Sequence, residues 1–172
     1  MKTKRTSIAA VALLGLAAAL AACASAERDA GLGPVAPLKV EGEGYRGVIL
    51  PADAGAETGE ADEGTWVPTS EQVRAAERRL AAYVRAGAAE REPGPWKPLS
   101  DYHRQYLGTL RDGRRCIYIN LLLRSWWESA RKRGRDGDRQ LVVVFDGGDT
   151  FMQAEYDVEA NEILWFSVNG EA

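Results

Sequence analysis

The chain has 172 residues, 45% of them hydrophobic and 27% charged, and a formal net charge of −3 at pH 7. This length and composition fit one globular domain with additional segments. Two cysteines exclude a disulfide framework. The acidic balance disfavours nucleic acid as a partner, because phosphate backbones bind positive surfaces.

The first 22 residues have the layout of a secretory signal peptide. Three basic residues, Lys2, Lys4 and Arg5, precede an apolar stretch from 8 to 22 that is rich in Ala and Leu. This stretch is shorter than the roughly 20 residues that a membrane-spanning helix needs. We therefore predict that residues 1–22 are removed. The cleavage takes away three basic residues and no acidic one, so the net charge moves from −3 to −6.

The stretch ends in Leu20-Ala21-Ala22-Cys23, which resembles the lipobox of bacterial lipoproteins. The resemblance implies that the Cys23 thiol receives a diacylglycerol, that the chain is cut before Cys23 and that the new amino terminus is acylated. Three acyl chains anchor a protein far more firmly than one. In this family an Asp after the cysteine commonly keeps the protein at the inner membrane, so Ala24 implies the outer membrane, facing the periplasm. The alternative is an ordinary secretory signal with an incidental Cys23.

Residues 23–64 are predicted to be the lipidated cysteine and a flexible, acidic tether. The segment is rich in Ala, Gly, Glu, Asp and Pro and has a single aromatic residue, Tyr45. Such a composition buries too little apolar surface to offset chain entropy. A second interpretation stays open for 39–41 and 45–50, which could add a short strand to the sheet of the domain.

The globular domain is predicted over residues 65–172 and begins with a helix. Thr69 and Gln72 have the spacing of a capping box. Apolar residues then recur at helical spacing as far as Gly87: Val73, Ala76, Leu80, Tyr83 and Val84. We expect this helix to lie with its apolar face on a sheet.

Strands are predicted in the rest of the domain. Residues 104–111 and 114–123 flank Asp112-Gly113, a pair that favours the type I′ turn of a tight hairpin. Three further strands are predicted at 140–146, 149–157 and 162–168. One N-terminal helix followed by a four- or five-stranded antiparallel meander sheet indicates an α+β fold.

This order of elements resembles the cystatin-like fold. The cystatin inhibitors carry a Gln-x-Val-x-Gly loop after the helix and a Pro-Trp pair later in the chain. The nearest match here, Gln105-Tyr106-Leu107-Gly108, is one residue short, and Pro95-Trp96 precedes it. The resemblance is therefore one of architecture, which does not carry function. The tail Asn169-Gly170-Glu171-Ala172 also resembles that of uncharacterised bacterial secreted proteins, which names no activity.

The sequence predicts no catalytic residue, no metal site and no cofactor. His103 is the single histidine, so the spaced His and Cys pairs of zinc sites are missing. No serine lies in a nucleophile motif. The acidic turn 146–149 lacks the further oxygen ligands of a calcium loop. Cys116 is expected to be a small buried thiol within a strand.

The most unusual segment joins two tryptophans to a dense run of basic residues. The candidate binding residues are Trp126, Trp127, Arg131, Lys132, Arg133 and Arg135. Tryptophan beside Arg or Lys suits a membrane interface, anionic headgroups or an anionic polymer. The alternative is that the tryptophans pack under the connection 124–139 while the basic residues form a solvated loop.

Together these features predict a non-enzymatic lipoprotein of the cell envelope. Its partners would be the membrane, through the lipid anchor, and another envelope protein or an anionic surface, which the tether lets the domain reach. A protease inhibitor on the cystatin-like scaffold is the first alternative, and a small envelope enzyme is the second.

Overall fold

The computed structural model describes residues 37–55, 63–87, 97–135 and 137–170. All of them belong to the second of two compact units, which begins at Val35. The predicted signal peptide, Cys23 and the first part of the predicted tether lie outside the described residues.

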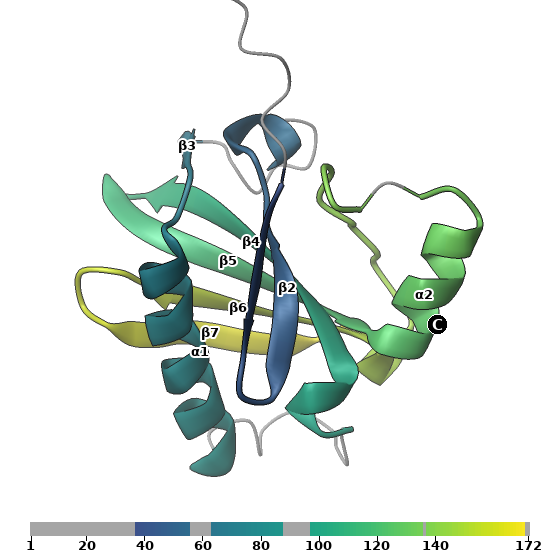
Figure 1. The fold of residues 1–172 in the computed structure, drawn as a ribbon. Coiled ribbons are helices and arrows are strands. Elements are labelled where there is room, and N and C mark those ends of the chain that lie inside the picture. The colour runs from purple at the N-terminus through teal and green to yellow at the C-terminus, as the bar shows by residue number, and fades with distance from the viewer. Residues whose placement is uncertain (1–36, 56–62, 88–96, 136, 171–172) are drawn as a thin grey trace, which may run out of the picture. The chain divides into compact units, whose positions relative to one another are not determined.

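Within the described residues, seven strands form one sheet (Figure 1). The strands are β1 (Leu38–Gly42), β2 (Tyr45–Ile49), β3 (Thr65–Trp66), β4 (Tyr102–Arg111), β5 (Arg114–Leu123), β6 (Phe151–Asp157) and β7 (Glu162–Val168). Their order is β1-β2-β4-β5-β6-β7, and β3 pairs with the C-terminal part of β4. Every pair is antiparallel except β2 and β4, which run parallel.

Two α-helices accompany the sheet, α1 (Ser70–Arg85) and α2 (Arg124–Lys132). They lie at the left and at the right of the view in Figure 1. Three short 3₁₀ turns complete the described elements, at Ala52–Gly55, Leu99–Asp101 and Gly148–Thr150.

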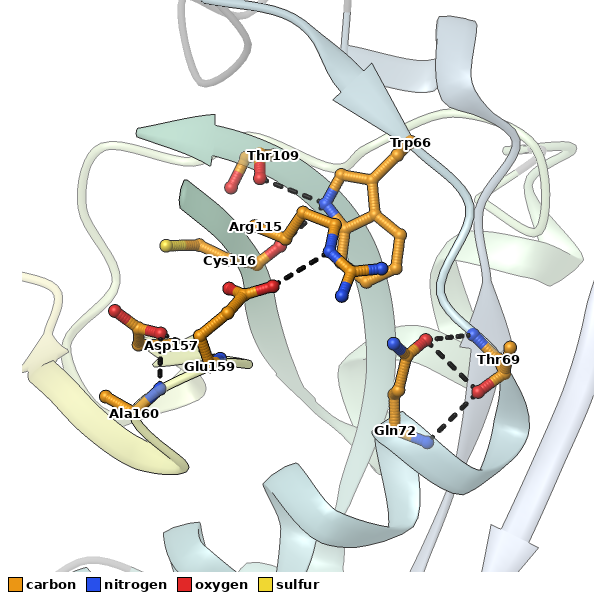
Figure 2. A network of polar contacts seen from close by, with 9 residues as sticks. All are labelled: Trp66, Thr69, Gln72, Thr109, Arg115, Cys116, Asp157, Glu159 and Ala160. Atoms are coloured by element: carbon orange, nitrogen blue, oxygen red, sulfur yellow. Dashed lines mark hydrogen bonds and ion pairs between the residues drawn. The ribbon is translucent and has the colours of Figure 1, made fainter. Parts of the chain in front are cut away.

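The predicted helix and its cap are confirmed. The Thr69 hydroxyl accepts the backbone N–H of Gln72 at 3.2 Å, and Oε1 of Gln72 accepts the backbone N–H of Thr69 at 2.9 Å (Figure 2). This reciprocal capping box satisfies donors that the first helical turn would otherwise leave unpaired. The buried positions Val73, Ala76 and Leu80 then form the stripe that packs on the sheet.

The predicted hairpin at Asp112-Gly113 is confirmed as well. Arg111 pairs with Arg114, so the connection has only two residues, and both have positive φ angles, 50° and 71°. A type I′ turn requires this conformation, which Gly adopts freely and Asp tolerates. The local sequence therefore fixes the register of β4 against β5.

Strand alternation gives the sheet two covered faces. The α1 face carries Tyr102, Arg104 and Tyr106 of β4, beneath the stripe of α1. The opposite face, called the α2 face below, carries the intervening residues, including His103 and Gln105. Its apolar contacts with α2 and the following segment join Leu122, Trp127, Val142 and Phe151. Because both faces are covered, β5 is buried over almost its whole length.

A tryptophan attaches the two-residue strand β3 to the central hairpin. The indole N–H of Trp66 points to the carbonyl oxygens of Thr109 (3.0 Å) and Cys116 (3.2 Å), and the Arg115 guanidinium lies 5.2 Å from its ring centroid (Figure 2). Arg115 is held in turn by Glu159 at 2.9 Å. These side-chain contacts compensate for the few ladder bonds of β3.

The predicted fold, one N-terminal helix on a four- or five-stranded antiparallel meander of cystatin-like architecture, is wrong. Three strands precede α1, a second helix follows β5, and the sheet contains a parallel pair. The inhibitor alternative rested on the cystatin-like scaffold, which this sheet does not have.

The difference arises largely in residues 38–49, which the predicted tether included. They form β1 and β2, as the added-strand interpretation allowed. β2 pairs with β4, a strand distant in sequence, and β1 pairs with β2. Tertiary pairing overrides local composition here.

The strand predicted at 140–146 is also wrong, because these described residues belong to no helix or strand. Side-chain amides on the α2 face satisfy the backbone instead. Oε1 of Gln105 accepts the Val142 N–H at 2.9 Å, and Nδ2 of Asn120 donates to the Val142 carbonyl at 2.7 Å. With its hydrogen bonds satisfied in this way, the segment needs no partner strand, and β6 forms its hairpin with β7.

Candidate functional site

A groove of about 390 Å³ lies between the β1–β2 hairpin and α2. We call it the α2 groove. The side chains around it come from β1, β2, β4, α2 and the segment after α2. The helix α2 was not predicted, and the β1–β2 hairpin was only the second interpretation of residues 39–41 and 45–50. The groove therefore depends on two elements that lie outside the predicted fold.

The floor of the α2 groove is an aromatic stack. His103 of β4 and Trp127 of α2 lie with ring centroids 4.5 Å apart and an interplanar angle of 8°. Trp127 also rests on the bare backbone of Gly137, where a Cβ atom would come within 2.2 Å of the indole. The indole of Trp127 therefore separates the groove from the interior of the protein, and Trp127 is only 3% exposed.

Four cationic side chains surround this floor: Lys39, Arg46, Arg124 and Arg131. Strand alternation places Lys39 and Arg46 on the α2 face, as the pairing of Lys39 with Val48 and of Arg46 with His103 requires. On α2, the positions 124, 127 and 131 recur at helical spacing, so one stripe supplies both arginines and the tryptophan.

Three acidic residues also line the groove: Glu41, Glu128 and Asp138. Only one of them forms an ion pair with a groove cation, since Oδ2 of Asp138 lies 3.7 Å from Nη2 of Arg131. Within the described part of the chain, neither Lys39 nor Arg46 has an ion-pair partner. Glu41 lies directly across the β1–β2 pair from Arg46 without forming an ion pair with it, so among the described lining residues four cations face three acids.

The same charge acts on the histidine. Burial and then the positive charges of Arg104, Arg131, Arg46 and Arg124 lower the pKa of His103 to about 4. His103 is thus a neutral imidazole at pH 7, with one nitrogen available as a donor and one as an acceptor. The charges that lower its pKa most are those of four arginines.

Two buried nitrogen atoms of groove residues lack a hydrogen-bond partner. They are Nε2 of His103 and Nε of Arg124, and Thr109 Oγ1 is the only other such side-chain atom among the described residues. Arg124 is held at its other end, where a guanidinium N–H donates to the Ser100 carbonyl. Unsatisfied buried polar atoms are costly and often mark sites that a ligand or water completes.

The structure divides the predicted binding residues instead of gathering them. Trp127 and Arg131 line the groove. Trp126 packs edge-on against Phe151 with the ring centroids 4.8 Å apart, and the Arg135 guanidinium lies 5.8 Å from the centroid of the Trp126 ring. The other two, Lys132 and Arg133, are exposed at the end of α2, where Nη1 of Arg133 donates to Ser129 Oγ at 2.7 Å. Cations there complement the partial negative charge of the helix terminus.

Sequence reasoning missed Lys39, Arg46, His103 and Arg124 as groove residues. The helical spacing of Arg124, Trp127 and Arg131 was a usable signal, once residues 124–132 were seen as a helix and not as a connection. No comparable signal marked Lys39 and Arg46, because their segment has the composition of a tether.

Other candidate chemistry is limited in the described residues. No group of three or more His, Cys, Asp or Glu side chains there could hold a metal ion. Cys116 is a fully buried free thiol in β5, as expected, and burial raises its pKa to about 11. Across the ranges that the structure covers, no helix has the length and apolar character needed to span a bilayer.

Comparison with known proteins adds no relative. No family model matches this sequence, no curated protein matches it, and no solved structure matches its fold.

Proposed function

We propose that this chain is a lipoprotein of the cell envelope, anchored through Cys23, and that its domain is a non-enzymatic binding module. The α2 groove is its ligand-binding surface, and the ligand is part of another envelope protein or of an anionic envelope surface. The lipobox-like sequence Leu20 to Cys23 supports the anchor.

The observation that carries the binding role is the unsatisfied polar character of the groove. Side chains from strands and a helix distant in sequence converge on it, and two of its buried nitrogens lack partners. Protein interiors rarely leave such atoms unsatisfied without a structural or functional reason. A concave site with a few convergent polar groups is the usual form of a ligand site.

The chemistry of the groove favours binding over catalysis. Of the described residues that line it, none is Ser, Thr or Cys, so a hydroxyl or thiol nucleophile is missing from that set. His103 stacks on Trp127 and has no carboxylate that would orient it as a base. The cationic groups can hold and orient an anion without a chemical step.

The anchor is tested by intact mass and membrane fractionation of the chain and of its Cys23→Ser variant. We expect a triacylated chain that begins at Cys23 and sediments with membranes, and a variant that loses both the added mass and the membrane attachment. A mature chain without lipid in the soluble fraction would refute the anchor.

The groove is tested by photo-crosslinking in cells. A photoreactive residue at Glu41, on the rim of the groove, is compared with the same residue at Glu71, an exposed position on α1. We expect a discrete crosslinked product from position 41 that Arg131→Gln abolishes, and none from position 71. Equal products from both positions, or a product that Arg131→Gln leaves unchanged, would contradict the assignment of the groove.

A further inference from the structure

We propose that the α2 groove recognises a phosphate group of its ligand. This inference rests on the proposed binding function and makes it chemically specific. The phosphate would lie above the His103–Trp127 stack, between Arg46 on β2 and Arg131 on α2, with Arg124 beside it.

The charge balance of the groove favours an anionic ligand. Its lining has four cations and three acids, and the acid nearest to an arginine, Asp138, is still 3.7 Å from Arg131. An optimal charge-assisted hydrogen bond is about 2.7–2.9 Å long, so Arg131 retains donor capacity toward a ligand. Arg46 and Lys39 add two cations that form no ion pair among the described residues, although Glu41 lies across the strand pair from Arg46.

The number of arginines that line the groove favours a group with more than two oxygens. A carboxylate has two oxygens and is satisfied by a single guanidinium in a bidentate pair. Here three arginines from two elements line the groove, Arg46 from β2 and both Arg124 and Arg131 from α2. Phosphate offers three or more oxygens in different directions, and arginine is the residue that suits phosphate geometry best.

The two unpartnered nitrogens fit the same ligand. The Nε–H of Arg124 is a donor, and Nε2 of neutral His103 is a donor in one of the two imidazole tautomers. Both atoms are buried, so a phosphate oxygen would supply their missing acceptor only after the surrounding side chains shift. A ligand without oxygen acceptors would leave both atoms unsatisfied.

The phosphate could belong to a phospholipid headgroup or to a soluble phosphate ester, because the groove would contact the same oxygens in each. Inorganic phosphate therefore serves as the first probe. Glycerol 3-phosphate represents a soluble monoester, and glycerophosphoglycerol represents the phosphodiester of an anionic headgroup. Acetate represents a carboxylate.

The experiment is isothermal titration calorimetry on the full chain in non-ionic detergent, at constant ionic strength and without phosphate in the buffer. The groove variants are Arg46→Gln and Arg131→Gln. Lys132→Gln is the matched control, because it removes the same charge from the next residue of the same helix and Lys132 does not line the groove. All three residues are exposed, and thermal unfolding verifies that each variant folds.

We expect saturable binding of inorganic phosphate that each groove variant weakens about tenfold, which corresponds to about 1.4 kcal/mol, while Lys132→Gln leaves it unchanged. Tighter binding of the diester than of the monoester assigns the phosphate to a headgroup, and the reverse order assigns it to a soluble ester. Binding of acetate as tight as phosphate, or an equal loss in Lys132→Gln, would overturn the phosphate assignment. No saturable binding, with the crosslink from position 41 intact, would overturn this inference alone and leave the binding module standing.

Discussion

His103 and Trp127 lie face to face at 4.5 Å in the covered interior between the sheet and α2. The contact joins a central strand to a nine-residue helix that has no side-chain N-cap. A helix this short is marginal by itself and depends on tertiary packing. The stack therefore both positions α2 and makes the only histidine of the chain part of the interior.

Stability should fall as the pH is lowered from about 6.5 to about 4. The pKa of His103 is about 4 in the folded chain, against an ordinary value near 6.5. Between these values the unfolded chain binds the proton more readily than the folded chain, so acidification favours unfolding. Burial and the positive charges of Arg104, Arg131, Arg46 and Arg124 act in the same direction.

The measurement is urea unfolding of the chain and of His103→Gln at pH 7.5, 6.0, 5.0 and 4.0. The loss attributable to His103 should approach an upper value on the order of 3 kcal/mol near pH 4 and be absent above pH 7. Carboxylates contribute equally to both proteins and cancel in the difference. Parallel pH profiles for the two proteins would show that His103 does not carry this dependence.

A buried ion pair beneath α1 should be costly to break from one side. Nε of Arg104 lies 3.2 Å from Oε1 of Glu77, which also accepts the hydroxyl proton of Tyr106 at 2.8 Å. Arg104 is fully buried and Glu77 is 6% exposed. We expect Glu77→Ala to reduce the free energy of unfolding by about 3–5 kcal/mol, because it leaves a buried guanidinium uncompensated.

The control is Arg78→Ala, at an exposed position of the same helix, which should stay within about 0.5 kcal/mol of the parent chain. Guanidinium chloride denaturation monitored by circular dichroism gives both values. If Glu77→Ala lowers the free energy of unfolding no more than Arg78→Ala does, the Arg104–Glu77 ion pair makes no net contribution to stability.

What the sequence predicts well here is local. The capping box at Thr69, the two-residue turn at Asp112-Gly113 and the last strand from Glu162 each depend on residues within a few positions of one another. Backbone preferences and side-chain capping act over that range. The helix α1 and the β4–β5 hairpin could therefore be predicted with their ends nearly correct.

What the sequence fails to show depends on contacts between distant residues. The strand β2 pairs with β4 and β1 with β2, and the segment around Val142 is held by amides from β4 and β5, so both depend on partners that the local sequence does not specify. The candidate site could not be predicted for the same reason, because Lys39 and Arg46 lie on the same face as His103 only when β1 pairs with β2 and β2 pairs with β4. Trp127 and Arg131 were found from composition alone.

The amide contacts to Val142 give a further prediction. Gln105→Leu should raise the hydrogen-exchange rate of the Val142 amide, because Oε1 of Gln105 is the acceptor of that N–H. Removing it also leaves Nδ2 of Asn120 with one partner fewer. We expect a cost of roughly 1–3 kcal/mol in unfolding free energy, the range for an unsatisfied buried group.

Gln153→Leu is the matched control, since Gln153 pairs with Asn120 on the next strand and has no side-chain hydrogen bond among the described residues. Hydrogen exchange followed by nuclear magnetic resonance separates the two variants. Faster exchange at Val142 in both, or in neither, would mean that the Gln105 side chain does not hold this segment.

The two cysteines should differ in reactivity in a way that reports on fold and anchor together. Cys116 is fully buried in β5, and burial, followed by the charges of Glu155 and Asp157, raises its pKa to about 11. At pH 8 only about a thousandth of such a thiol is ionised, against roughly a quarter of a free cysteine. Iodoacetamide should therefore leave Cys116 unmodified in the native chain and modify it fully in urea. Cys23, if it is a lipid thioether, should resist alkylation under both conditions, so mass spectrometry would find one label after unfolding and none before.

A native label on Cys116 would show that β5 is not buried as described, whereas a native label on Cys23 would leave the fold intact and remove the proposed anchor.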